Sequence, residues 1–177
     1  LNVGFFYEKM YVMIGKMKWN RKTIIGLDEA GRGSFAGRVF VGAVLLSPAR
    51  RKLISRSPMK LSDSKRLTPS QREAWMEWMK KQNIPYAWGA SSSVYIDHKG
   101  IVSACTAAAQ GAIKKVLEQS PSLRPFLVLD AGLHAGEYES RFSYTSFPKA
   151  DEIESAVSLA SIVAKVMRDR EMVRLAK

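Results

Sequence analysis

Apolar and β-branched residues gather in short runs along this chain, each bounded by glycine, proline or charged residues. The runs TIIGLD at 23–28 and RVFVGAVLL at 38–46 predict two neighbouring strands of one sheet. YAWGASSSVYI at 86–96 is a third strand candidate, and PFLVLD at 125–130 is a further buried strand that ends in an acid, as the first does. These runs predict a sheet whose strands are well separated in the sequence.

Helical signals stand between the strand candidates. Thr68 and Gln71 have the spacing of a capping box, and Pro69 occupies the first helical position. The apolar side of this helix is predicted to carry Trp75, Met76, Trp78 and Met79. We expect the helix to end by Pro85, because proline cannot continue it.

Two longer helices are predicted further along. Asp97 is expected to cap the first, which ends before Pro121 and has apolar residues at helical spacing: Ile101, Cys105, Ala108, Ala112, Ile113 and Val116. The second follows SFPKADEIES, reaches Arg168 or beyond, and is marked by Ile153, Ala156, Val157, Ala160, Val163, Ala164 and Met167. Interleaved strands and helices predict an α/β or mixed α+β sheet with helices on its faces.

The remaining segments set the domain organisation. SPARRKLISRSPMKLSDSKRL, at 47–67, is rich in Lys and Arg without clear periodicity, and is predicted to be a basic surface loop. Residues 1–20 are assigned to an N-terminal extension or an added segment, and 21–177 to a single catalytic domain. Charges interrupt the apolar opening, so we expect neither a signal peptide nor a membrane span there.

The net charge of the chain indicates which class of partner it binds. The 177 residues include 28 Lys and Arg against 16 Asp and Glu, a net charge of +12 that favours a polyanion. A basic protein without a specific polyanion partner is the alternative, and membrane-surface binding is less favoured because the basic residues are dispersed. The one cysteine, Cys105, indicates a reducing compartment such as the cytoplasm, and is predicted to fill the core. His98 and His134 have no cysteine partners, which makes a zinc site improbable.

Four acids form the candidate chemical centre. Asp28 and Asp130 each end a predicted apolar strand, and Glu29 directly follows Asp28. Asp151 stands at the predicted start of the last helix. Ligands of open sheets bind beyond the strands' carboxyl ends, so these carboxylates could converge. Two like charges about 4 Å apart cost roughly 4 kcal/mol at an effective dielectric of about 20, so the cluster needs protons or cations. Oxygen-only ligands favour Mg²⁺ or Mn²⁺.

Each of these features also has a simpler interpretation. Any one acid could be a turn residue or a helix cap, and the turn GRG at 31–33 could be only a tight turn. Its glycines do not have the spacing of a dinucleotide fingerprint. They do allow close approach of a ligand to the backbone, and Arg32 could contact phosphate. Taken together with the basic charge, the acids predict two-metal phosphoryl chemistry on nucleic acid.

Four separated motifs carry a family resemblance: GLDEAGRG, LSDSKRLTPSQR, VLDAG and KADEIESAVSLASIVAKVMRDR. In this order, from Ile24 to about Arg170, the chain closely resembles ribonuclease HII, the type 2 ribonuclease H family. The resemblance implies a ribonuclease H-like α/β fold with a central mixed sheet flanked by helices. It also implies cleavage of the RNA strand in RNA–DNA hybrids and at ribonucleotides embedded in duplex DNA, leaving 5′-phosphate and 3′-hydroxyl ends.

The resemblance also assigns residues. It makes metal ligands and catalytic residues of Asp28, Glu29, Asp130 and Asp151. It makes substrate-binding residues of Gly31, Arg32, Gly33, Asp63, Ser64, Lys65, Ser161, Lys165 and Arg168, the glycine turn reading the ribose 2′-hydroxyl. A monomer that acts in the cytoplasm, in replication and DNA repair, is the corresponding expectation.

The chain departs from the family pattern in three places. Ser34 stands where proline is common, and Ala131 where a glycine usually follows the third acid. The family's later segment, with a tyrosine that stacks on the deoxyribose beside the ribonucleotide, has no match before Lys177. Two alternatives follow: a non-catalytic hybrid-binding or inactive truncated homologue, and a nuclease of the wider superfamily that acts on DNA.

Overall fold

The computed structural model describes residues 19, 21–34, 36–61, 64, 66–121 and 123–176. Its strands form one five-stranded sheet in the order β3-β2-β1-β4-β5. Their bounds are β1 Ile24–Ala30, β2 Val39–Leu46, β3 Tyr86–Ser91, β4 Phe126–Asp130 and β5 Tyr144–Phe147. β1 pairs antiparallel with β2 and parallel with β4, so the sheet is mixed, as predicted.

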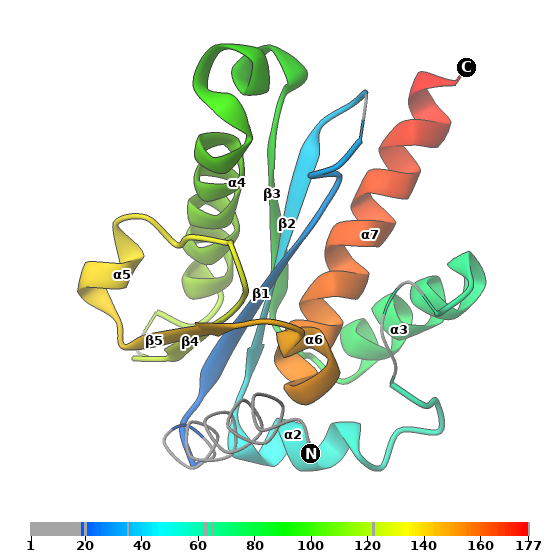
Figure 1. The fold of residues 1–177 in the computed structure, drawn as a ribbon. Coiled ribbons are helices and arrows are strands. Elements are labelled where there is room, and N and C mark those ends of the chain that lie inside the picture. Colours follow the sequence, from blue (N-terminus) through cyan, green and yellow to red (C-terminus); the bar gives the residue numbers. More distant parts are fainter. Residues whose placement is uncertain are drawn as a thin grey trace, which may run out of the picture.

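Helices cover both faces of this sheet. They are α2 Pro48–Ile54, α3 Pro69–Lys81, α4 Ser93–Glu118, α5 Tyr138–Arg141, α6 Ala150–Ile153 and α7 Ser155–Leu175. Figure 1 shows α4 on one side of the sheet and α7 with α3 on the other. Each side has its own buried cluster, with Val44 and Val157 in one and Leu45 and Ile113 in the other. No described helix combines the length and apolar character needed to span a membrane.

Helix α7 can lie close to the sheet because two strand residues lack side chains. A Cβ at Gly26 would stand 2.3 Å from the carbonyl carbon of Ala156, and one at Gly42 would stand 2.1 Å from the carbonyl oxygen of Ala160. Real Cβ atoms essentially never approach backbone atoms so closely, because the overlap is strongly repulsive. The glycines of β1 and β2 therefore fix the height of α7 above the sheet.

Most of the predicted elements are confirmed. All four strand candidates contain strands, but the candidate at 86–96 is wrong over its second half, because β3 ends at Ser91 and α4 begins at Ser93. Helix α3 begins with the predicted capping box: Thr68 Oγ1 accepts from Gln71 N at 3.2 Å, and Gln71 Oε1 accepts from Thr68 N at 2.8 Å. Cys105 is fully buried, and burial raises the pKa of its thiol to about 11. Its prediction as a core residue is confirmed.

The predicted loop at 47–67 is wrong over part of its length, because α2 occupies residues 48–54. Ser47 caps this helix by accepting from Arg50 N at 3.3 Å, and Pro48 stands at its start. Only Ile54 is buried on it. The helix therefore has clear start signals but too short an apolar face to give a periodic pattern.

Asp97 does not cap α4, contrary to the prediction. Ser92 does so, its hydroxyl accepting from Tyr95 N at 3.1 Å, and Asp97 lies inside the first helical segment. Gly100 then interrupts the helix with φ 78° and ψ 160°. The predicted cap lies near this kink, where the apolar periodicity of the second segment begins.

The last helix also differs from the prediction, because it is two helices. Glu154 between α6 and α7 is extended, with φ −117° and ψ 116°, and caps α7 by accepting from Ala156 N at 3.5 Å. Asp151 therefore lies in the one-turn helix α6, not at the start of the long helix. Strand β5 and the short helix α5 were not predicted. Asp28, in turn, is not the end of its strand, since β1 continues to Ala30.

Trp19, which the sequence analysis assigns to the extension, lies in the core. It is 1% exposed, and its ring stacks on Phe126 at 5.7 Å and on Phe147 at 5.9 Å between centroids. Its indole Nε1 donates to Glu154 Oε2 at 3.1 Å. The rest of the segment 1–20 lies outside the described residues.

Candidate active site

A cavity of about 570 Å³ opens where β1 and β4 meet the loops that follow them and the inner face of α7. Its lining includes most of the site residues predicted from the sequence: Asp28, Glu29, Gly31, Arg32, Gly33, Ser64, Asp130, Asp151, Ser161, Lys165 and Arg168. Asp63 and Lys65 lie outside the described residues. The predicted convergence of segments far apart in the sequence is therefore found around one cavity.

Strand pairing places the first and third acids side by side. β1 and β4 are parallel and Leu27 pairs with Leu129, so Asp28 and Asp130 follow in adjacent positions. Side chains alternate along a strand, and Asp28 shares the α7 face of the sheet with Ile24. Glu29, one residue on, projects from the opposite side of β1. The two neighbouring acids therefore approach the cavity from different sides of the strand.

A backbone hydrogen bond brings Asp151 to the same place. Asp130 Oδ1 accepts from Ala150 N at 3.0 Å, so the end of β4 holds the start of α6. Lys149, just before it, has a left-handed φ of 57° that turns the chain into the helix. Asp151 follows immediately and contributes to the field at Asp28. Asp151 is therefore positioned by this turn and by the hydrogen bond to Ala150 N.

Burial is the largest influence on the pKa values of the first two acids. Burial, then the charges of Glu29 and Asp130, raises the pKa of Asp28 well above its ordinary value of 3.8. Burial also raises the pKa of Glu29, although Arg32 opposes the shift. Arg32 Nη1 lies 3.4 Å from Glu29 Oε1 and donates to Gly132 O at 3.1 Å. Among the described residues, buried Glu29 Oε2 has no hydrogen-bond partner.

These acids suit a hard divalent cation by their chemistry. All four offer oxygen ligands, and the unpartnered Glu29 Oε2 is a buried acceptor that a cation would satisfy. Within the described part of the chain, however, no three His, Cys, Asp or Glu side chains are gathered closely enough to hold one ion. By its chemistry, the oxygen-only donor set fits Mg²⁺ or Mn²⁺.

The opposite wall of the cavity is polar and basic. Ser64 and Ser161 share a 2.5 Å hydroxyl hydrogen bond that joins Ser64 to α7. Arg72 strengthens this link, donating to Ser64 O and to Asp169 Oδ2, both at 3.0 Å. Lys165 pairs with the same Asp169 at 2.6 Å. These contacts hold Ser64 and α7 together as one wall.

The glycine turn lies against this wall. Gly31 has φ 101°, a conformation that side chains rarely adopt, and a Cβ there would stand 2.8 Å from Arg168 Nε. Gly33 has open space, with no atom within 4 Å of a Cβ position. The first glycine is therefore required by the fold, whereas the second leaves the backbone open to a ligand.

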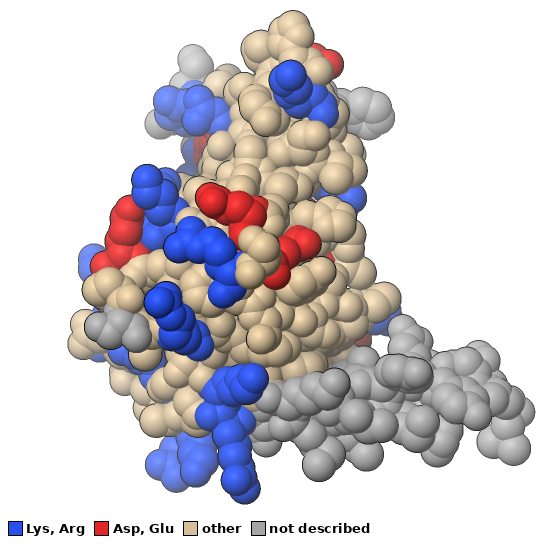
Figure 2. All heavy atoms as spheres, turned by 90° about the vertical axis from the view of Figure 1, so that its left-hand side faces the viewer, with Lys and Arg blue, Asp and Glu red and all other residues tan. Residues whose placement is uncertain are grey.

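The sequence analysis did not assign four of the lining residues to the site: Ala30, Ser34, Lys149 and Glu152. Lys149 and Glu152 form an exposed ion pair at 3.6 Å. Their closeness to Asp151 in the sequence was the available signal, but the left-handed turn at Lys149 could not be foreseen. Figure 2 shows acidic side chains gathered near the middle of one face with Lys and Arg beside them.

Replacing Asp28 by Asn is expected to raise the melting temperature of the cation-free protein at neutral pH by a few degrees. For a protein of this size, each kcal/mol of added stability raises the melting temperature by about 2–4 °C. The pKa of Asp28 is raised above 3.8 in the folded chain, so at pH values between 3.8 and the raised pKa this carboxyl is protonated more often in the folded chain than in the unfolded chain. The free energy of unfolding therefore falls as pH rises through this range. Above the range, the ionised carboxylate destabilises the fold to its full extent. Thermal melts from pH 4 to pH 8 in EDTA measure this.

Asp97→Asn, on the exposed start of α4, is the matched control and should leave the melting temperature unchanged. An Asp28→Asn variant that melts below the unaltered protein at pH 7, with the same pH slope, would contradict the assignment.

Comparison with known proteins places this cavity in context. The family model described as Ribonuclease HII matches residues 25–177. A ribonuclease HII of Thermus thermophilus is 35% identical over 156 residues, which cover 87% of this chain and 68% of that protein. The residues matched by the family model include the strands, the turn and the helix that line the cavity.

Solved structures agree on the fold. Ribonuclease H2 from Pyrococcus horikoshii OT3 superposes with a TM-score of 0.65 at 28% identity, over 86% of this chain and 75% of that one. Bst-RNase HIII in complex with Mn²⁺ gives a TM-score of 0.73 at 19% identity, over 92% of this chain. The chain spans 57% of the length of Bst-RNase HIII.

Proposed function

Because this chain belongs to the ribonuclease HII family, we propose that it is a metal-dependent endoribonuclease that cuts the RNA strand of RNA–DNA hybrids and at ribonucleotides embedded in duplex DNA. The observation that carries the proposal is the joint placement of four carboxylates, the glycine turn and the basic face of α7 around one cavity. The net charge of +12 supports a nucleic-acid substrate. Action as a monomer in the cytoplasm, in replication and repair, belongs to the same proposal.

The cation ligands in this proposal are Asp28, Glu29, Asp130 and Asp151. A pair of divalent cations would supply a water activated for attack and stabilise charge on the leaving oxygen. Mn²⁺ is bound by Bst-RNase HIII, which shares the fold. The residues' own contribution is to stay ionised. Burial, and then the charges of Glu29 and Asp130, make this unfavourable for Asp28 until positive charge is present.

The reaction is the hydrolysis of one phosphodiester. The water oxygen bonds to phosphorus, the bond from phosphorus to the 3′ oxygen breaks, and that oxygen takes a proton. The products are a 5′-phosphate and a 3′-hydroxyl. Lys165 and Arg168 on α7 line the cavity and would bind the phosphates on either side of the cut.

Selection for RNA is assigned to the turn Gly31–Gly33. The open surface at Gly33 exposes peptide groups that can both donate to and accept from a ribose 2′-hydroxyl. Arg32 also lines the cavity, and its hydrogen bonds to Glu29 and to Gly132 O would hold the turn in place beside the substrate. A 2′-deoxyribose would leave these peptide groups without that partner.

A cleavage assay with three labelled duplexes tests the proposed function: an RNA–DNA hybrid, a DNA duplex with one ribonucleotide, and an all-DNA duplex. With Mg²⁺ or Mn²⁺ we expect cuts in the first two, with 3′-hydroxyl ends that a polymerase extends, and no cut in the third. EDTA should stop the reaction. Binding of the hybrid without any cut would favour the non-catalytic alternative, and cutting of all-DNA duplex would favour a DNA nuclease.

A further inference from the structure

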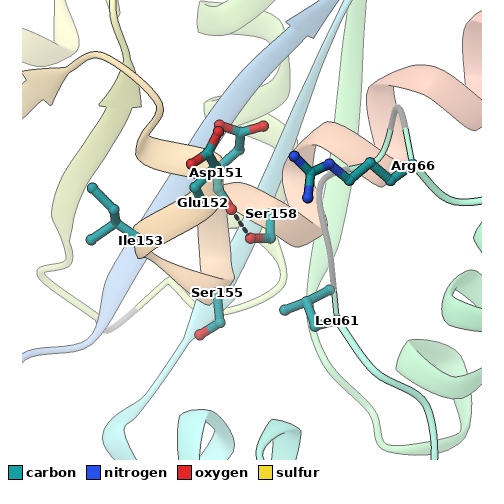
Figure 3. Close-up of a pocket in the computed structure, with 7 residues that line it drawn as sticks. All are labelled: Leu61, Arg66, Asp151, Glu152, Ile153, Ser155 and Ser158. Carbon is teal, nitrogen blue, oxygen red and sulfur yellow. Dashed lines mark hydrogen bonds between the residues drawn. The ribbon is translucent and has the colours of Figure 1, made fainter.

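A chain of cavities leaves the candidate active site along the start of α7 and helix α2. The first, about 370 Å³, shares Asp151 and Glu152 with the active-site cavity, and Figure 3 shows Arg66 facing these acids across it. A second, about 560 Å³, shares Leu61 and Ser155 with the first. Shared lining residues make these cavities one continuous depression, which we call the α2 groove.

A third cavity, about 480 Å³, shares Arg51 and Ser55 with the second and is counted as part of the α2 groove. Each of the three cavities has exposed basic residues in its lining: Arg66 in the first, Lys60 in the second, and Arg21 with Lys52 in the third. Arg21, Lys52, Lys60 and Arg66 are all exposed. Among the described residues that line the groove, acids occur only at the end that joins the active site. A polyanion leaving the acidic centre would therefore meet cations along this path.

The wall of the groove is fixed by buried contacts. Arg51 Nη2 donates to Trp19 O at 3.3 Å and to Lys22 O at 2.7 Å, and its Nη1 lies 3.8 Å from Glu154 Oε2. Glu154 is 3% exposed and begins α7, so one ion pair ties α2 to the helix that carries the cavity wall. Figure 1 shows α2 lying below α6 and the start of α7. The basic residues beside Arg51 are thus presented on a rigid support.

Serine residues also line the groove. Ser55 and Ser57 do so from the turn that follows α2, and Ser155 from the first position of α7. Hydroxyls, lysine and arginine are the groups that contact nucleic-acid backbones without reading sequence. The seven residues of α2 span about 10 Å, or about three phosphates of one strand at about 3.4 Å each along the axis.

We propose that the α2 groove binds the sugar–phosphate backbone of the duplex flanking the cleavage site, on one side only. This inference rests on the proposed function, since it places the scissile phosphate at the carboxylates. It adds a second contact region, outside the catalytic cavity, that contributes affinity without base specificity. A substrate with too short a flank on that side would lose this contact.

The test is a triple neutralisation, Arg21→Gln, Lys52→Gln and Lys60→Gln, which removes three exposed groove charges. The matched control, Lys99→Gln, Lys114→Gln and Arg124→Gln, removes three exposed charges that line none of these cavities. Hybrid binding is measured against salt concentration in EDTA. The slope of log affinity against log salt should flatten by about 2.7 in the groove variant, at about 0.9 for each lost phosphate contact. The control slope should change by less than one.

Flank length gives a second readout. Duplexes trimmed on the 5′ side or on the 3′ side of the ribonucleotide should differ in affinity for the unaltered protein, and this difference should vanish in the groove variant. Maximal cleavage rates at saturating substrate should stay equal in all three proteins. Equal salt slopes for the groove and control variants would overturn the inference, even if cleavage is normal. Absence of cleavage by the unaltered protein, with the slopes as expected, would overturn only the proposed function.

Discussion

Asp130→Asn is expected to lower hybrid cleavage by about a hundredfold to a thousandfold or more, the order seen when one group that stabilises developing charge is removed. Asparagine is neutral, so it cannot help to balance a divalent cation. It keeps an oxygen where Asp130 Oδ1 accepts from Ala150 N at 3.0 Å, so the link from β4 to α6 is retained. Single-turnover cleavage with Mg²⁺ measures the loss.

Two controls separate lost chemistry from lost structure. In EDTA, the circular dichroism spectrum of the Asp130→Asn variant should match that of the unaltered protein. Its melting temperature should be equal or higher, because one of several neighbouring negative charges is removed. Asp97→Asn should cleave normally. Unchanged cleavage by Asp130→Asn would remove this carboxylate from the proposed site.

Gly42→Ala is expected to destabilise the fold by about 3 kcal/mol, the upper part of the range for overpacked cores. The new methyl group would stand 2.1 Å from the Ala160 carbonyl oxygen and 3.0 Å from Ala164 N, so the backbone of α7 must move away from the sheet. A loss of roughly 6–12 °C in melting temperature follows for a protein of this size. Since Gly42 pairs with Asp28 across the strands, the displacement also widens the cavity at its acidic end.

Two other glycines provide the controls. Gly111→Ala in α4 meets only ordinary contact, with the nearest atom at 3.9 Å, and should be neutral or stabilising by up to about 1 kcal/mol. In Gly89→Ala, the new methyl group would stand 1.9 Å from the Ala108 carbonyl oxygen. This variant should destabilise the fold as strongly as Gly42→Ala, but by displacing α4 on the other face of the sheet. Assayed well below both melting points, Gly42→Ala should cleave more slowly than Gly89→Ala. Equal rates would show that the height of α7 does not matter for catalysis.

Strong local signals allowed much of this fold to be predicted. The buried strands β1, β2 and β4 are continuous apolar runs, and α3 carries its own capping box, so their local preference agrees with the tertiary structure. β5 was missed because its four residues alternate only between exposed and half-buried positions. Residues 48–54 were missed as a helix because a single buried residue, Ile54, gives no periodicity.

The candidate site could be predicted where the acids follow recognisable strands. Asp28 and Asp130 are adjacent because β1 and β4 pair in parallel, which the similar endings of their sequences suggested. Asp151 was predicted in the cavity for a partly wrong reason. Its position comes from the left-handed turn at Lys149 and the hydrogen bond from Ala150, not from the start of a long helix. Such a turn depends on tertiary contacts that no local pattern contains.

The buried indole of Trp19 bears on how this domain should be produced in the laboratory. A recombinant version cut to begin at β1 would remove the ring that covers Phe126 and Phe147, and would leave the Glu154 carboxylate without its indole donor. That carboxylate begins the helix on which Ser161, Lys165 and Arg168 stand. The family match starts at residue 25, but an expression boundary chosen by that match would fall inside the folding unit.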